Sequence, residues 1–208
     1  YFRDRLVRLA PSLGYQMVGA EGLTDRKPPD LTAAVGRLRP ARPEAVILAL
    51  YPEQAQAVMR AKAALGWRDV TMVATGPLTD EQYLNVEGGA AEGTIGFCLY
   101  PDPNQDQSAG VREYRRLMAT HFPGRPLNRY SLYGYVFGRL VAEGLERAGP
   151  SPTTEGFVGA MESIRSWDSG GIIPPVSFSP ENHHAQRAGF ICELRDGRFE
   201  PKTGWLEP

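Results

Sequence analysis

The sequence lacks any long apolar run and carries almost no net charge. No stretch approaches the roughly 20 apolar residues that span a bilayer, and no charged segment followed by an apolar one indicates a signal peptide. The formal net charge is −1 and the basic residues are scattered, so nothing resembles the electrostatic footprint of a nucleic-acid binder. We therefore expect neither a membrane-spanning segment nor a nucleic-acid partner.

Cysteine is scarce: the chain has two, Cys98 and Cys192. No C-x-x-C spacing occurs, which argues against thiol redox catalysis and a structural zinc. Both cysteines lie in strand-like runs, at residues 94–98 and 189–192. Two interpretations stay open: two buried free thiols, or a disulfide between neighbouring strands, which needs an oxidising compartment.

Histidine is scarce as well, with His183 and His184 adjacent and His121 far away. Adjacent side chains diverge, whereas metal ligands on a helix share one face at i, i+4. A solvated loop is the simpler interpretation of this pair. We expect no metal.

Catalytic motifs are missing too. No G-x-S-x-G elbow occurs, and the pairs Gly88-Gly89 and Gly170-Gly171 lack the spacing that cradles phosphate. Asp168 and Glu162 are an imaginable acid and base, but nothing in the sequence places them together. The sequence predicts no enzyme and no cofactor.

The composition is that of a globular protein, 42% hydrophobic and 23% charged over 208 residues, enough for one sizeable core or two small ones. The chain begins Tyr1-Phe2-Arg3, without methionine, and residues 2–12 already have a helical pattern. We interpret the sequence as a fragment or processed product, so the missing signal segment is uninformative.

The stretch at residues 45–93 organises the chain. Residues 45–50 are a run of apolar residues between breakers, which predicts a strand buried on both faces. Pro52 and Glu53 then favour a helix start, Gly66 ends that helix, and a second strand follows at residues 70–74. This is a strand–helix–strand unit with parallel strands.

Ligands of open parallel sheets bind at the carboxyl ends of the strands. Tyr51 and Thr75-Gly76 occupy these ends, and a tyrosine offers both an apolar face and a hydroxyl. Taken alone, Tyr51 is more simply explained as packing against the helix start. We nevertheless expect the ligand to bind at these carboxyl ends of the strands.

Before and after this unit the pattern alternates between helix and strand as far as residue 99, which predicts an α/β layer with a parallel sheet. Asp30 is expected to cap a helix, and Asp80 to cap a short one. The expected elements are helices at 2–12, 31–39 and 80–86, and strands at 15–21 and 94–99.

The pattern changes at Tyr100. A polar connector at residues 101–108 is followed by helices expected at 110–122, 131–148 and 154–164, with no strand between them. Short strands are expected at 176–178 and 189–193, and Asp196-Gly197 predicts a hairpin turn. Because no strands lie between these helices in the sequence, they must pack on a surface formed by other segments.

The order of these motifs resembles the branched-chain amino-acid (Leu/Ile/Val) family of substrate-binding proteins of ABC transporters, which have the type I periplasmic binding fold. The resemblance covers essentially the whole chain and rests on an ordered series rather than one motif. The matching segments are Tyr1-x-x-Asp4, residues 30–35, residues 44–53, Ala90-Ala91-Glu92-Gly93, Tyr133, residues 145–149, Pro175-Val176-Ser177-Phe178 and Asp196-Gly197-Arg198-Phe199.

Such proteins have two α/β lobes joined by crossing strands, and this chain resembles only their latter half or so. The resemblance implies that residues 1–99 form most of the second lobe and residues 100–190 the helical part of the first, with its returning strands. Residues 191–208 would be the final crossing and the tail. With the first-lobe strands absent, the helices near residues 110 and 131 would expose apolar stripes and favour self-association.

The resemblance also implies a ligand site between the lobes. Tyr1 and Tyr51 match the second-lobe tyrosines that line it. Gly76 falls where amino-acid binders place a carboxylate against the ligand ammonium, so either another residue pairs that charge or the ligand has no ammonium. Asn128 falls where the family often has an aromatic residue, which implies a more polar ligand there.

By this resemblance the function is that of a solute receptor for an ABC importer, not an enzyme. It would bind a small organic acid, amide or amino acid and partner an ABC permease. Its location would be periplasmic or otherwise extracytoplasmic, with lipid anchoring one alternative. A ligand-sensing domain of a regulator or receptor on the same fold is the competing hypothesis, because fold does not decide function.

Overall fold

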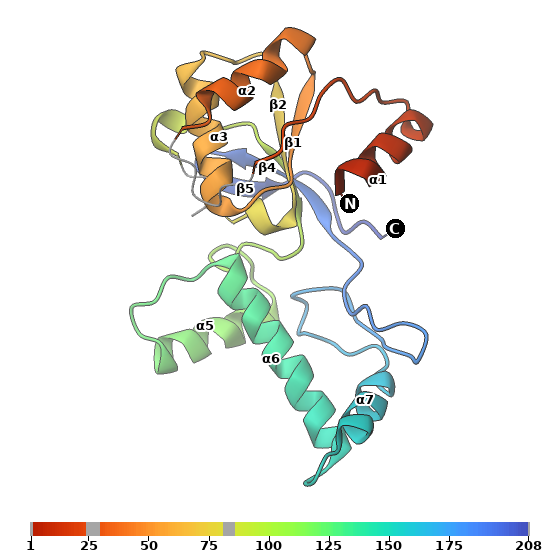
Figure 1. Ribbon diagram of the computed structural model, residues 1–208. Coiled ribbons are helices and arrows are strands. Elements are labelled where there is room, and N and C mark those ends of the chain that lie inside the picture. The colour runs from red at the N-terminus through yellow and green to blue at the C-terminus, as the bar shows by residue number, and fades with distance from the viewer. Residues whose placement is uncertain (1, 24–29, 81–85, 208) are drawn as a thin grey trace. The chain divides into compact units, whose positions relative to one another are not determined.

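The computed structural model (Figure 1) describes residues 2–23, 30–80 and 86–207. The chain divides into two compact units. Unit 1 comprises residues 1–97 and 191–202, and unit 2 comprises residues 98–190 and 203–208. No helix in the described part of the chain is both long and apolar enough to cross a membrane.

A five-stranded sheet contains all the named strands, in the order β1-β2-β3-β4-β5. The strands are β1 (Ala45–Leu48), β2 (Thr71–Ala74), β3 (Ile95–Cys98), β4 (Phe190–Arg195) and β5 (Arg198–Pro201). The pairs β1–β2 and β2–β3 are parallel, and β4–β5 is antiparallel. The predicted α/β class with a mainly parallel sheet is therefore confirmed, as is the hairpin, whose turn residues Asp196 and Gly197 have φ of 49° and 72°.

Among its described residues, unit 1 contains the helices α1 (Phe2–Leu9), α2 (Thr32–Leu38) and α3 (Pro52–Ala64), with short 3-10 turns at Ala10–Leu13, Arg39–Ala41, Gly76–Leu78 and Glu87–Gly89. α2 and α3 lie side by side (Figure 1). The N-cap of α2 is Leu31, one residue after the predicted Asp30, whose carboxylate accepts the amide of Thr32 at 2.7 Å. α3 begins at a proline and ends before Gly66, whose φ of 57° favours glycine. The expected helix at 80–86 lies mostly outside the described residues.

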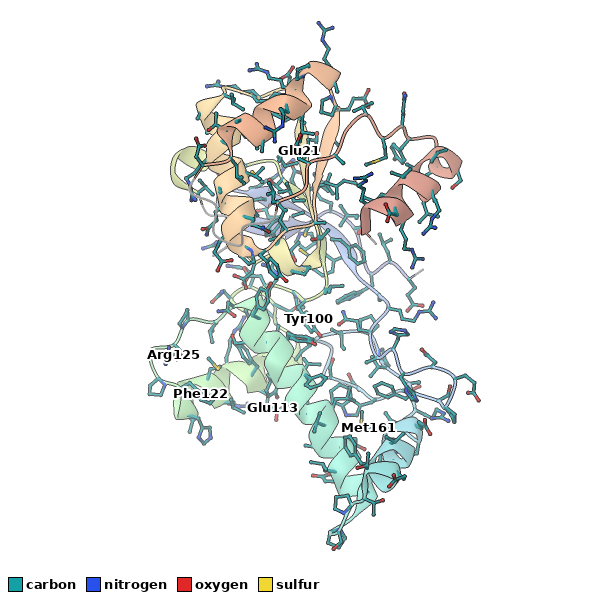
Figure 2. The ribbon with its side chains drawn as sticks, in the orientation of Figure 1. Glu21, Tyr100, Glu113, Phe122, Arg125 and Met161 are labelled. Carbon is teal, nitrogen blue, oxygen red and sulfur yellow. The ribbon has the colours of Figure 1, made fainter. Side chains whose placement is uncertain are left out.

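The predicted strand at residues 15–21 is wrong, because this segment has no strand structure. Its side chains are exposed, Tyr15 by 72%. At its end, Glu21 (labelled in Figure 2) forms an ion pair with Arg37 of α2, with a distance of 2.8 Å between Oε2 and Nη2. A strand requires a neighbour for its backbone groups, and among the described residues this segment has none.

The prediction that the strand at residues 45–50 is buried on both faces is also wrong. β1 lies at the edge of the sheet, and Ile47 is 43% exposed while Leu48 is 2% exposed. An edge strand in contact with the sheet core on one face only leaves alternate side chains in solvent. Apolar composition alone does not distinguish the two situations.

Unit 2 contains α5 (Ala109–His121), α6 (Arg129–Ala148) and α7 (Thr154–Glu162). Side chains cap all three: Ser108, Asn128 and Thr153 accept amides of the first turns. α6 and α7 approach closely at Gly144, because a Cβ there would meet Met161 and Phe157. Figure 2 labels Met161 on α7. The expected strand at 176–178 is wrong: Val176 makes one isolated bridge, to Trp167.

One apolar cluster forms the core of unit 2. It is built by side chains of the segment before α5, of α5 and α6, and of the segment after α7, namely Tyr100, Val111, Tyr114, Met118, Leu132, Val136, Leu140, Ile164, Ile172, Ile173, Val176 and Phe178. The expectation that the stripes of α5 and α6 would be exposed is therefore wrong for these residues, because the stripes cover each other. A different face of α6 is exposed, with Tyr133 at 48% and Phe137 at 56%.

Candidate functional site

The carboxyl ends of β1 and β2 meet at one edge of the sheet in unit 1. Leu48 and Ala74, the last residues of the two strands, are register partners. Thr75 continues this contact, since its amide and hydroxyl both donate to the carbonyl of Leu48, at 3.4 and 3.0 Å. The structure thus brings together the two strand ends at which Tyr51 and Thr75-Gly76 were expected.

Tyr51 is held at this edge as the N-cap of α3. Its backbone is extended, its amide donates to Oε1 of Gln54 at 3.1 Å, and the residue is 55% exposed. Gln54 is 5% exposed. The buried side-chain amide of Gln54 therefore fixes the backbone of Tyr51, whose ring is accessible.

Gln54 was missed by sequence reasoning, although a signal was present. A glutamine three residues after an N-cap is one half of a capping box. The capping residue itself, a tyrosine, is not one of the usual Ser, Thr, Asp or Asn, and this conceals the pattern.

Gly76 opens the 3-10 turn Gly76–Leu78. Its carbonyl accepts both the amide and the hydroxyl of Thr79, at 3.1 and 2.8 Å, and the carbonyl of Thr75 accepts the amide of Leu78 at 2.8 Å. No carboxylate occupies position 75 or 76. Asp80, four residues after Gly76, is buried at 2% exposure, and Glu53 is exposed in the first turn of α3.

Two predicted ligand residues remain, Tyr1 and Asn128. Tyr1 lies outside the described residues. Asn128 belongs to unit 2, where its Oδ1 accepts the amide of Ser131 at 2.8 Å as the N-cap of α6. Beside it, the buried Arg129 donates from Nε to the carbonyl of Tyr100 at 3.0 Å. Burial, with a smaller effect of Tyr133, raises the pKa of the Tyr100 phenol well above its ordinary value, so this group stays protonated.

The histidines form no metal site in the described ranges, where no group of three or more His, Cys, Asp or Glu converges. His183 Nε2 lies 2.8 Å from Oε1 of Glu162. Both cysteines are disulfide-bonded. Cys98 ends β3 and Cys192 lies within β4, and both are fully buried.

Solved structures similar to the chain include proteins of ABC transporters. A branched-chain amino-acid ABC transporter protein from Thermus thermophilus with bound valine is 20% identical, with a TM-score of 0.79 over 97% of this chain and 55% of that one. A substrate-binding protein from Aeropyrum pernix is 22% identical, with a TM-score of 0.82 over 98% and 55%.

A solute-binding protein from R. palustris in complex with 4-hydroxybenzoate is 17% identical, with a TM-score of 0.80 over 99% and 56%. These likenesses concern the fold, and the chain spans about 55% of the length of the first two proteins. No curated protein matches the chain.

The sequence profile of a family described as "Periplasmic binding protein" matches residues 2–198. This match covers nearly the whole chain, and the resemblance inferred from the motif series is confirmed. The chain belongs to the periplasmic binding protein family.

Proposed function

We propose that the protein is a solute receptor of an ABC importer that binds a small organic acid, amide or amino acid without chemically changing it. The observation that supports this most is that the family match coincides with an accessible tyrosine and a Thr-Gly turn at adjacent strand ends. Ligands of open α/β sheets bind at such an edge. The partner is an ABC permease, and the buried disulfide fits an extracytoplasmic, oxidising location.

The ligand presents no ammonium to this edge. An ammonium removed from water needs a paired carboxylate, and position 76 has no side chain. The first turn of α3 offers partial positive charge instead, which suits a carboxylate, hydroxyl or amide oxygen. Glu53 is the one exposed carboxylate in that turn, so it is the residue to test if an amino acid does bind.

Binding is tested by a thermal-shift screen of the whole gene product. The panel is valine and leucine, their deaminated acids and amides, 4-hydroxybenzoate and a fatty acid. A ligand at 100 times its Kd stabilises the native state by about 2.7 kcal/mol, so a true ligand raises Tm clearly. We expect shifts with ligands that lack an ammonium. No shift with any compound, together with turnover of one, would contradict the receptor function.

Replacing Tyr51 with alanine is expected to weaken binding of the best ligand about tenfold, since truncating an aromatic contact commonly costs more than about 1 kcal/mol. Isothermal titration gives the Kd. Tyr15→Ala is the matched control, because Tyr15 is also exposed in unit 1 but lies outside the edge. Equal affinities of the two variants would remove Tyr51 from the site. Glu53→Gln should leave binding unchanged, and weaker binding by this variant would contradict a ligand without an ammonium.

We further propose that residues 1–99 form most of the second lobe, residues 100–190 the helical part of the first and residues 191–208 the last crossing. Two observations support this division. The helices α5, α6 and α7 follow one another without a named strand between them. An α/β lobe needs a sheet on which such helices pack, and the chain spans about 55% of the length of its neighbours.

The 208-residue chain by itself is expected to self-associate through the outer face of α6, defined as Tyr130, Tyr133, Gly134, Phe137 and Gly138, because all five are exposed. Sedimentation velocity should show dimers or larger species that dissociate in the Phe137→Asp variant. Phe122→Asp, at an exposed site after α5, should leave association unchanged. A monomeric chain that binds no hydrophobic dye would contradict this proposal.

A further inference from the structure

The β4–β5 hairpin joins the sheet from far along the chain. Glu92, just before β3, accepts the amides of Asp196 and Gly197 on its two carboxylate oxygens, at 3.0 and 2.8 Å. The first of these bonds joins residues 104 positions apart. Bringing such distant segments together carries a loop-closure cost that local strands do not have.

β3 and β4 are hydrogen-bonded neighbours in the sheet, and further backbone bonds join them where β3 begins. The amide of Gly93 donates to the carbonyl of Leu194 at 2.9 Å, and the amide of Leu194 donates to the carbonyl of Thr94 at 2.8 Å. On the outer side, β5 is a four-residue edge strand. It ends at Pro201, which has no N–H for a further ladder bond. Its place therefore depends on how firmly β4 is held.

Cys192 is held directly against the backbone of β3. A Cβ at Gly96 would lie 2.9 Å from Cys192 Sγ and 3.1 Å from the Phe199 ring, so only glycine leaves room for both. The disulfide partner, Cys98, lies two residues further along β3 and is fully buried, as is Cys192. The bond thus sits in the same packed layer as the hairpin's own core residues.

We propose that the Cys98–Cys192 disulfide is a clasp: once the two thiols are oxidised, the bond fixes the β4–β5 hairpin in the sheet. Because the bond is buried, it is then protected from reducing agents. The chemistry is thiol–disulfide exchange with a small-molecule or protein disulfide. Each cysteine loses its proton, one S–S bond forms between them, and the oxidant's disulfide takes two electrons and leaves as two thiols. Before oxidation, hydrogen bonds and packing alone hold the hairpin against β3.

Hydrogen exchange of the whole gene product tests the clasp. The oxidised protein is compared with the double variant Cys98→Ala/Cys192→Ala, which removes the bond without burying two hydroxyls. Amides of residues 190–199 should exchange at least tenfold faster in the variant. Amides of β1 and β2 are the internal control and should exchange at an unchanged rate.

Shielding is tested on the oxidised protein with dithiothreitol and an alkylating agent, read by mass. The bond should survive without denaturant and break in denaturant. Equal exchange of residues 190–199 in both proteins would overturn the proposal. So would equally faster exchange across β1 and β2, a variant that fails to fold, or rapid reduction of the native protein.

Discussion

Replacing Phe199 with alanine is expected to lower the free energy of unfolding by about 4 kcal/mol, the usual cost of emptying a fully buried aromatic site. Phe199 is 2% exposed and faces Leu194, likewise buried, across the hairpin. Its ring also fills the space left by the missing side chain of Gly96. The site cannot collapse easily, because neighbours from β3 and β4 define its walls.

Urea unfolding followed by circular dichroism measures this effect as a shift in the transition midpoint. Phe122→Ala is the matched control. Phe122 is 52% exposed and lies at the end of α5 (Figure 2), so its loss should change the free energy of unfolding by no more than about 0.5 kcal/mol. Similar midpoints for the two variants would mean that Phe199 is not in the core of the sheet.

Replacing Gly110 with alanine is expected to cost about 3 kcal/mol, at the upper end of overpacking penalties. Gly110 lies in the first turn of α5, and its amide donates to the carbonyl of Gly170 at 2.9 Å. An added Cβ would collide with the carbonyl oxygen of Ser169 and lie 2.8 Å from Ile172 Cγ1. A backbone oxygen cannot rotate away as a flexible side chain can.

Gly134→Ala is the matched control for this prediction, since Gly134 is a helical glycine of α6 with no atom within 4 Å of an added Cβ. Alanine there should raise the free energy of unfolding by about 0.5–1 kcal/mol, because it has the higher helix propensity. Thermal melts of both variants give the comparison. If Gly110→Ala were also neutral or stabilising, the close approach of α5 to residues 169–172 would be refuted.

Local signals predicted most of the elements. Pro52 and Gly66 bracket α3 as expected, and Asp196-Gly197 forms the turn that its composition favours. Such features depend on the chemistry of a few adjacent residues, which the sequence displays directly. The strand expected at 15–21 depends instead on a partner strand, and an apolar, alternating segment carries no information about whether that partner is present.

The candidate site was predictable to the same extent. Tyr51 and Thr75 could be placed together because parallel strands bring their carboxyl ends to one edge. The support by Gln54 was hidden by an unusual capping residue. The disulfide remained one of two alternatives because strand order, which decides whether Cys98 and Cys192 are neighbours, follows from the sheet and not from the spacing of the two cysteines.

The disulfide has a consequence for the connectivity of the molecule. Because it joins residues 98 and 192, it closes a covalent ring that contains the three helices α5, α6 and α7. The exposed Gly124-Arg125 turn, after α5, lies on this ring. A protease that cuts there opens the ring, but the disulfide keeps the two pieces covalently joined in one molecule.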